Sequence, residues 1–185
     1  MGNEIGFLVD NLSGSSRRGR QAAAGALSKV ALESPDVLVS HIDAFVDALN
    51  RPESQTRWEC LNVLTVLIAF DASSCAAAVP GAEAALFDED SGLLRLAAMR
   101  FLCTLGSESK DMSVKVWPLI DEAIQCYHGD LEFPEMLNAV IHFSESEIAS
   151  DVKSELASRM AFDAKNGKGA LKRRAQQILD NTANN

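Results

Sequence analysis

The residue types that most often do chemistry are scarce in this sequence and lie far apart. The histidines are His41, His128 and His142, and no two of them stand four residues apart on one helix. The metalloprotease pattern H-E-x-x-H is absent. The segment 167–169, Gly-Lys-Gly, lacks the leading glycine and the preceding strand of a phosphate-binding loop. We therefore expect no catalytic residue, no metal site and no bound cofactor.

The cysteines also argue against a metal or redox site. Cys60, Cys75, Cys103 and Cys126 include no C-x-x-C pair. Cys60 occupies the small-residue position of the helical pattern described next, where a buried free thiol behaves as a small apolar side chain. Unpaired cysteines within helices suit a reducing compartment, and we expect neither a signal peptide nor a membrane span. The sequence therefore favours a cytoplasmic protein.

A helical pattern recurs about every 38 residues, and it determines where along the fold the histidines and cysteines lie. It reads cation, two residues, small residue, two residues, apolar pair, two residues, apolar. Complete copies begin at Arg20, Arg57 and Arg95, a weaker copy begins at Phe133, and an incomplete copy begins at Lys172. The intervals of 37, 38, 38 and 39 residues are typical of stacked helix pairs.

The pattern also predicts a core. The large apolar position of each copy should be buried between neighbouring helices. Its occupants are Leu27, Leu64, Leu102, Val140 and Leu179. The small positions, with alanine at 23, 26 and 98, should let helices approach closely.

We expect one all-α domain over residues 1–185. Its predicted architecture is an α-α superhelix, a right-handed solenoid of about four helix pairs with a capping helix at each end. The capping helices are predicted at 1–14 and 168–182. The helix pairs are predicted at 16–50, 53–87, 90–128 and 130–163.

Proline positions mark the second helix of several pairs. Ser34 as N-cap and Pro35 at the first helical position predict a helix over 35–50. Pro80 and Pro118 each follow the start of their copy by 23 residues. At such a matched position a helix either bends or breaks and restarts, because proline removes one backbone hydrogen bond.

The first three copies resemble the HEAT-repeat family, within the wider class of armadillo-like superhelices, over roughly residues 16–180. The fourth copy departs from the pattern, with Phe133 and Pro134 where the cation stands. The resemblance implies that the second helix of each pair lines the concave side, and that the protein is a scaffold or adaptor holding a partner there. Some enzymes similar to this family bind iron through repeated His-Glu pairs, but here Ile, Gly and Phe follow the histidines.

Charge narrows the class of partner. The net charge is −9, and residues 83–163 carry 16 acidic and 6 basic residues, net −10. Residues 164–185 carry 1 acidic and 5 basic residues, net +4. The acidic middle disfavours nucleic acid and anionic membranes and favours a protein partner, with basic character.

Candidate partner-binding residues stand at matched positions in the second helices. At 20, 23 and 27 residues from the start of each copy, the rows are Ser40, Asp43 and Asp47; Ala77, Pro80 and Ala84; and Lys115, Pro118 and Glu122. We predict that Asp43, Asp47, Lys115 and Glu122 contact a partner, with a merely solvated face as the alternative.

The favoured function is a non-catalytic scaffold or adaptor that binds a partner peptide or domain in its concave groove. One alternative is an enzyme or enzyme subunit similar to a repeat-type lyase or a DNA glycosylase. Another is a standalone repeat protein that associates with itself.

Overall fold

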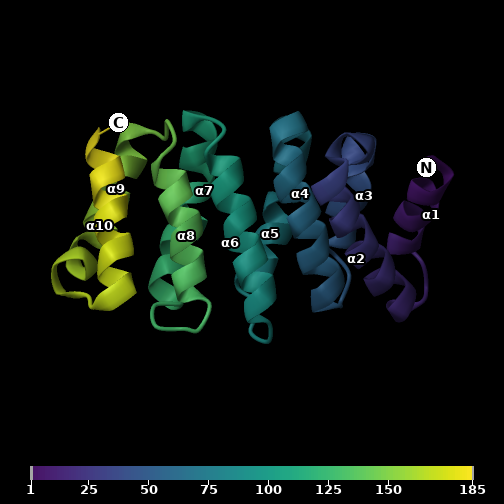
Figure 1. Cartoon of the computed structure of the whole chain (residues 1–185), viewed down its shortest axis with the longest axis horizontal. Helices are drawn as coiled ribbons and strands as arrows, with labels where there is room; N and C mark the ends of the chain where they lie inside the picture. The colour runs from purple at the N-terminus through teal and green to yellow at the C-terminus, as the bar shows by residue number, and fades with distance from the viewer. Residues whose placement is uncertain (1, 185) are drawn as a thin grey trace. The chain divides into compact units, whose positions relative to one another are not determined.

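The computed structural model describes residues 2–184, and every regular element among them is a helix (Figure 1). The predicted all-α class is therefore confirmed. The chain forms two compact units, the first ending at Phe101 and the second beginning at Leu102, within helix α6 (Gly92–Gly106). The predicted single domain and its division into capped pairs stay a prediction.

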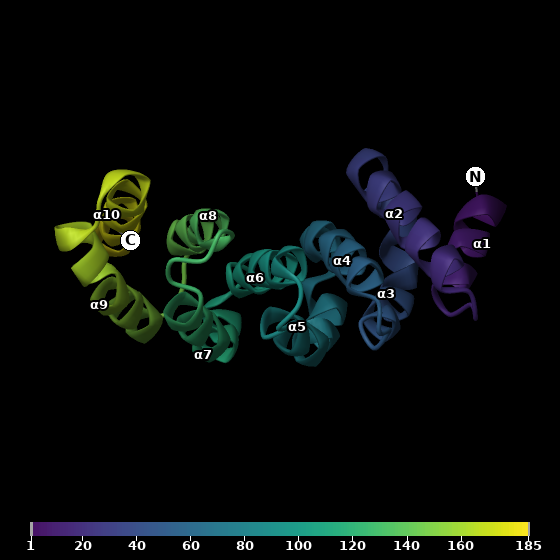
Figure 2. The same cartoon turned by 90° about the horizontal axis from the view of Figure 1, so that it is seen from below.

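The first unit is built from short and long helices in two layers. Its elements are α1 (Gly2–Leu12), α2 (Arg17–Glu33), the 3-10 helix η1 (Pro35–His41), α3 (Ile42–Ala48), α4 (Ser54–Cys75), the 3-10 helix η2 (Ala76–Ala78), α5 (Val79–Leu86) and the first part of α6. Figure 2 shows α3 and α5 on one side of this unit, with α2 and α4 on the other.

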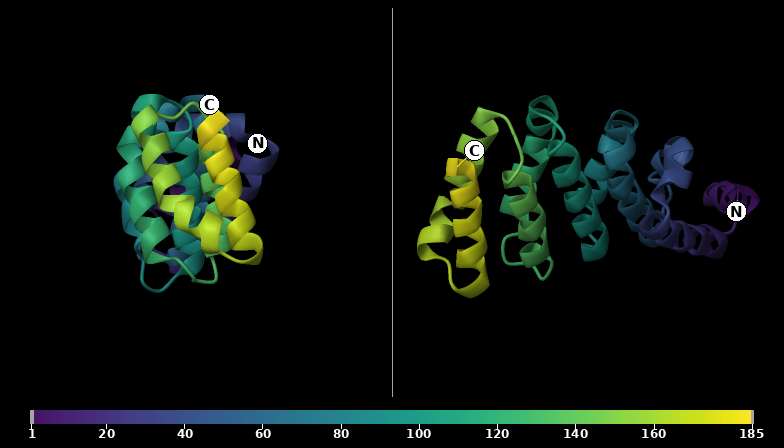
Figure 3. Two further views of the ribbon diagram at one scale, coloured as in Figure 1. Left: turned by 90° about the vertical axis from the view of Figure 1, so that its left-hand side faces the viewer. Right: turned by 45° about the horizontal axis from the view of Figure 1, so that its top comes forward.

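The second unit follows the same plan. Its elements are the rest of α6, α7 (Lys110–Cys126), α8 (Phe133–Ser144), α9 (Ser150–Asn166) and α10 (Gly169–Asn184). Here α7 and α9 lie on one side, and α8 and α10 lie on the other (Figure 2). Figures 1 and 3 show successive helices of this unit running up and down, so that the α7–α8 and α9–α10 connections share one end.

The side chains predicted for the core are buried as expected, with one exception. Leu27 and Leu64 in the first unit, and Leu102 and Val140 in the second, have no exposed surface. Burying such a side chain contributes about 1.5–3 kcal/mol. Leu179 is only half-buried, because α10 is the last helix of the unit and packs on α8 and α9 alone.

In the first two copies of the pattern, the recurring cation ties its helix pair to the loop before the next one. Arg20 forms an ion pair with the buried Glu53 and also donates a hydrogen bond to the carbonyl of Gly14 at 2.7 Å. Arg57 Nη1 lies 3.1 Å from Asp88 Oδ2. In these two copies the cation is thus a structural residue, and it holds an acid 33 or 31 residues further on. Arg95 of the third copy instead donates to the carbonyl of Asp88, in the loop before its own helix, at 2.9 Å.

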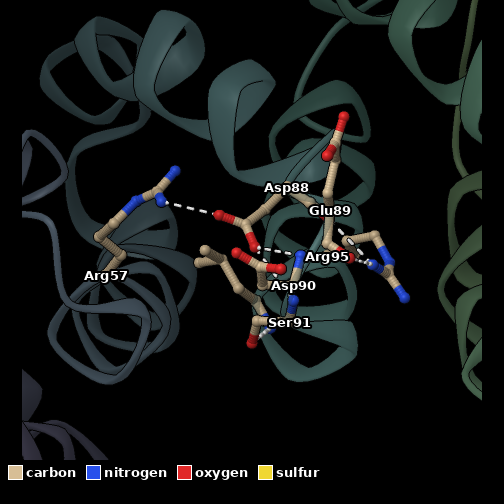
Figure 4. A network of polar contacts seen from close by, with 7 residues as sticks. Arg57, Asp88, Glu89, Asp90, Ser91 and Arg95 are labelled. Atoms are coloured by element: carbon tan, nitrogen blue, oxygen red, sulfur yellow. Dashed lines mark hydrogen bonds and ion pairs between the residues drawn. The ribbon is translucent and has the colours of Figure 1, made fainter.

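The loop that begins at Asp88 shows how one carboxylate organises such a junction (Figure 4). While one oxygen of Asp88 binds Arg57, the other accepts the backbone N–H groups of Asp90 and Ser91 at 3.1 and 3.0 Å. The Ser91 hydroxyl accepts the N–H of Leu94 at 3.3 Å, which caps helix α6.

The helix predicted over 35–50 is wrong in detail. Residues 35–41 form a 3-10 helix, and the α-helix begins only at Ile42. Ser34 makes no side-chain capping hydrogen bond, although Pro35 does take the first helical position. The segment contains Val37, Val39 and Ser40, which have low helix propensity, so the tighter 3-10 winding competes well here while it still buries Leu38.

The two matched prolines adopt different solutions. Pro80 lies in the first turn of α5, directly after the short helix η2, so here the helix restarts. Pro118 lies inside α7, where the helix continues past it. Both side chains are exposed. In the first turn of a helix a proline costs no hydrogen bond, whereas inside α7 Pro118 removes one.

Helix α4 is interrupted at Asp71, whose φ and ψ are −154° and 78°. The Asp71 carboxylate accepts the N–H and the hydroxyl of Ser74 at 2.9 and 2.7 Å, so it caps the turn in which the helix restarts. By length and composition alone the helical run Ser54–Leu86 could cross a membrane. In this fold the run consists of separate segments, and Leu64 and Leu67 on its first segment are fully buried in the unit.

Candidate functional site

Each unit has a candidate binding face, which is the outward face (the exposed side) of its second helices, and the structure places every predicted row at the surface of its own unit. The exposed residues are Ser40, Asp43, Asp47, Ala77, Pro80, Ala84, Lys115, Pro118 and Glu122. The register deduced from the repeat is therefore right for these positions. Their role in binding stays a prediction.

In the first unit this face consists of α3 and α5 together with the short helices that precede them. Its exposed ionisable side chains are all carboxylates. They are Asp36, Asp43, Asp47 and Glu83. Between these acids the surface of α5 carries small side chains at Ala77, Pro80 and Ala84. The face therefore has a uniform negative charge and little side-chain bulk, which suits a positively charged segment.

Asp43 and Asp47 share one helix and stand four residues apart, so their carboxylates lie on the same side of α3. Neither carboxylate forms an ion pair with any residue that the structure describes. Like charges four residues apart on a helix repel each other, and an external cation would relieve this repulsion.

Asp47 also borders a hollow of about 220 Å³ between α1 and α3. The hollow has an apolar floor and a charged rim. Its lining residues are Val9, Asp10, Leu12, Ser13, Ala44, Asp47, Ala48 and Arg51. Arg51 Nε is buried there without a hydrogen-bond partner. The carboxylates of Asp10 and Asp47 outnumber the guanidinium of Arg51 in this lining, so the hollow keeps an excess of negative charge. Its apolar floor suits the aliphatic stem of a lysine or arginine side chain, whose end is charged.

In the second unit the face of α7 and α9 is fixed by polar contacts between the two helices. Arg159 Nε and Nη2 donate to Asp121 Oδ1 and Oδ2 at 2.6 and 3.0 Å. The Asp121 carboxylate is the main reason that the pKa of Arg159 is raised. Trp117 is buried, and its Nε1–H donates to Glu155 Oε2 at 2.5 Å.

These contacts border an open polar hollow of about 460 Å³. Its lining residues are Asp121, Ser154, Glu155, Ser158 and Arg159. Sequence analysis missed Asp121, Glu155 and Arg159. A signal for them exists, because Trp117 and Glu155, and likewise Asp121 and Arg159, stand 38 residues apart, which is the period of the repeat.

The predicted residues thus divide between the units. Asp43 and Asp47 lie together on α3, and Lys115 and Glu122 lie on α7, on either side of the exposed Pro118. Lys115 and Glu122 do not line the polar hollow of their unit. The four predicted partner-binding residues therefore form two pairs, one on α3 of the first unit and one on α7 of the second.

Several of the groups that an enzyme could use are buried or have structural contacts. No cluster of three or more histidine, cysteine, aspartate or glutamate side chains within the described residues could hold a metal ion. His128 Nε2 lies 3.2 Å from both carboxylate oxygens of the buried Asp163, which ties the end of α7 to α9. Burial raises the pKa of the Cys75 thiol to about 12, and it also raises the pKa values of Cys60 and Cys103. Cys126 is exposed.

Comparison with known proteins supports the fold alone. No protein-family model matches the sequence, and no curated protein matches it. A designed armadillo repeat protein, solved in complex with the peptide (KR)4, superposes with a TM-score of 0.78 at 14% identity and covers 95% of this chain and 80% of its own. An engineered protein gives a TM-score of 0.76 at 15% identity, covering 97% and 79%.

A third structure, of computationally designed armadillo repeat proteins for modular peptide recognition, gives a TM-score of 0.76 at 13% identity and covers 94% of this chain and 80% of its own. The chain therefore has an armadillo-like helical repeat fold, and the predicted class of all-α superhelix is confirmed.

Proposed function

We propose that this chain is a non-catalytic repeat scaffold that binds a partner peptide or extended segment on the outward face of its second helices. The observation that carries the proposal is the face of α3 and α5, where every exposed ionisable side chain is a carboxylate and Asp43 and Asp47 lack ion-pair partners. Designed proteins with the same fold recognise peptides, which supports this class of partner.

The finer part of the proposal is that the segment bound by the first unit is basic. A chain of lysine and arginine side chains would place cations beside Asp43 and Asp47 and could lay one aliphatic stem in the hollow beside Asp47. The same negative charge repels nucleic acid and anionic membranes, so we expect neither as a ligand of this face.

The test is titration of the protein into a fluorescent peptide of four Lys-Arg repeats, read by fluorescence anisotropy. The double variant Asp43→Lys/Asp47→Lys should weaken binding about tenfold or more, because two favourable exposed charge contacts become repulsive. The variant Glu89→Lys/Asp90→Lys makes the same change of net charge at exposed positions of the α5–α6 loop, outside α3 and α5, and it should bind nearly as the wild type does.

Equal losses in both double variants would show that only net charge matters and would remove the proposed site. An acidic peptide of the same length should not bind. In the second unit, Glu122→Lys makes α7 more positive and Lys115→Glu makes it more negative. If α7 contacts the basic peptide, the first variant should weaken binding in the same titration and the second should strengthen it.

A further inference from the structure

The loop between α7 and α8 displays an apolar side chain that nothing in the unit covers. Leu131 is 99% exposed, whereas the apolar side chains that flank the loop in the folded unit, such as Phe133 and Leu137, are buried. The loop projects at the lower edge of the second unit in Figure 1, beside the α9–α10 turn. A fully exposed leucine at a loop tip gains nothing from folding, so it is a candidate anchor for a contact with another molecule.

A pocket of about 200 Å³ lies directly beside this leucine. Phe133, Pro134, Leu137 and Leu171 contribute its apolar walls, and Asp130, the residue before Leu131, stands at its edge. The pocket and the exposed side chain therefore belong to the same end of the same unit.

The charges of the pocket select an uncharged occupant. It is bordered by one carboxylate, Asp130, and one guanidinium, Arg174, and also by the imidazole of His128, which the carboxylate of Asp163 already engages. Arg174 Nε is already engaged by Asn138 Oδ1 at 2.7 Å. The positive and negative charges at the pocket balance, so it attracts neither an anion nor a cation. An aliphatic side chain, in contrast, would bury apolar surface against the four apolar residues of its walls.

We propose that a second copy of this chain supplies that side chain. In a two-fold symmetric contact, Leu131 of each copy enters the pocket of the other, which is possible because the pocket adjoins the loop that carries the leucine. The proposal goes beyond the scaffold function, which uses the opposite layer of helices.

Charge complementarity supports a second copy as the occupant. The loop carries Asp130, which is an exposed acid. The exposed cations Lys172 and Arg173 lie on α10, at the same end of the unit as the loop. A two-fold contact in which Leu131 enters the pocket brings Asp130 of each copy toward the cations of the other, so the same pairing forms twice.

The test begins with sedimentation equilibrium of the full-length wild-type chain over a range of concentrations. We expect a reversible monomer–dimer equilibrium. Leu131→Ser should raise the dimer dissociation constant more than about tenfold, because two apolar contacts are lost per dimer. Leu32→Ser replaces a leucine that is 78% exposed in the first unit, and it should leave the equilibrium unchanged.

A complementation experiment tests the geometry. Ala170 lines the pocket, and Ala170→Phe should fill it while leaving Leu131 in place. Neither variant alone should dimerise well, because each symmetric dimer then lacks both insertions. An equimolar mixture of Leu131→Ser and Ala170→Phe should recover one of the two insertions, measured as mixed dimers by energy transfer between differently labelled copies.

A wild-type chain that stays monomeric at the highest soluble concentration would overturn the proposal. A dimer that Leu131→Ser leaves intact would overturn it as well, and so would a mixture that associates no better than either variant alone. Circular dichroism of each variant confirms that the fold is retained.

Discussion

Glu53 is a buried charged residue that contributes to the structure through its ion pair with Arg20, the cation of the first repeat copy. Its side chain is almost fully buried, and both carboxylate oxygens face the guanidinium of Arg20. Breaking such a pair leaves an uncompensated buried charge, which costs far more than the loss of an exposed ion pair. The hydrogen bond from Arg20 holds the pKa of the Glu53 carboxyl below its ordinary value of 4.5.

A pH dependence of stability follows from this lowered pKa. The contribution of Glu53 is present at pH values above the ordinary glutamate range, and it is lost as the pH falls through the lower pKa of the folded protein. We therefore expect Glu53→Gln to lower the free energy of unfolding strongly near pH 7 and much less near about pH 3. Urea denaturation at the two pH values measures this difference.

Glu83→Gln is the matched control, because Glu83 is exposed on α5. It should change stability little at either pH. If Glu53→Gln destabilises equally at both, the ionised state of Glu53 contributes nothing and the pair acts only through its shape.

At the scale of helices, close approach depends on a glycine in the second unit. A Cβ atom added at Gly106 would lie 2.7 Å from both Phe143 and Val116, two side chains with no exposed surface. No flexible chain end can move aside there. The last residue of α6 is therefore glycine because α7 and α8 pack directly against its backbone.

We expect Gly106→Ala to destabilise the protein by about 1–3 kcal/mol through overpacking. The control is Gly25→Ala in α2, where an added Cβ meets only Glu59 Oε1 at 3.8 Å. That variant should be stabilised by roughly 0.5–1 kcal/mol, because alanine loses less backbone entropy than glycine in a helix. Thermal unfolding of the two variants should therefore shift in opposite directions, and shifts of the same sign would contradict the packing argument.

The sequence predicted the helices well where the apolar pattern was strong, and poorly where local backbone chemistry decided the outcome. The periodic residues of the first helices, such as Leu27 and Leu64, have the burial that their spacing predicts. The 3-10 helix at Pro35–His41 could not be foreseen, because 3-10 and α-helices share nearly the same apolar periodicity over so short a segment.

At the scale of the whole molecule, each unit has a core of its own. Leu64 in the first unit and Leu137 in the second are equivalent in size, and both have no exposed surface. Replacing either with alanine should cost about 2–5 kcal/mol. We expect Leu64→Ala to reduce hydrogen-exchange protection mainly in residues up to 101, and Leu137→Ala mainly in residues from 102 onward.

Mass-spectrometric hydrogen exchange of the two variants resolves this pattern. Loss of protection that spreads evenly over both units in each variant would show that the cores unfold as one. In a repeat protein, the range over which such a defect spreads measures the coupling between neighbouring modules.

The exposed rows of the candidate surface followed from the repeat register, but its polar contacts did not. The exposure of Asp43 and Glu122 required only the helical period. The ion pair between Asp121 and Arg159 depends on which side chains of two different helices reach each other, and that is fixed by how the helices pack. The exposure of Leu131 could not be predicted either, because it lies in a loop, outside the periodic helical pattern.

The burial of three of the four cysteines gives the native chain one practical property. Cys60, Cys75 and Cys103 are enclosed, and their raised pKa values keep them in the unreactive thiol form at neutral pH. A maleimide dye added to the folded protein should therefore attach to Cys126 alone. Because one thiol reacts, the wild-type sequence can carry a spectroscopic label at a single position without prior removal of any cysteine.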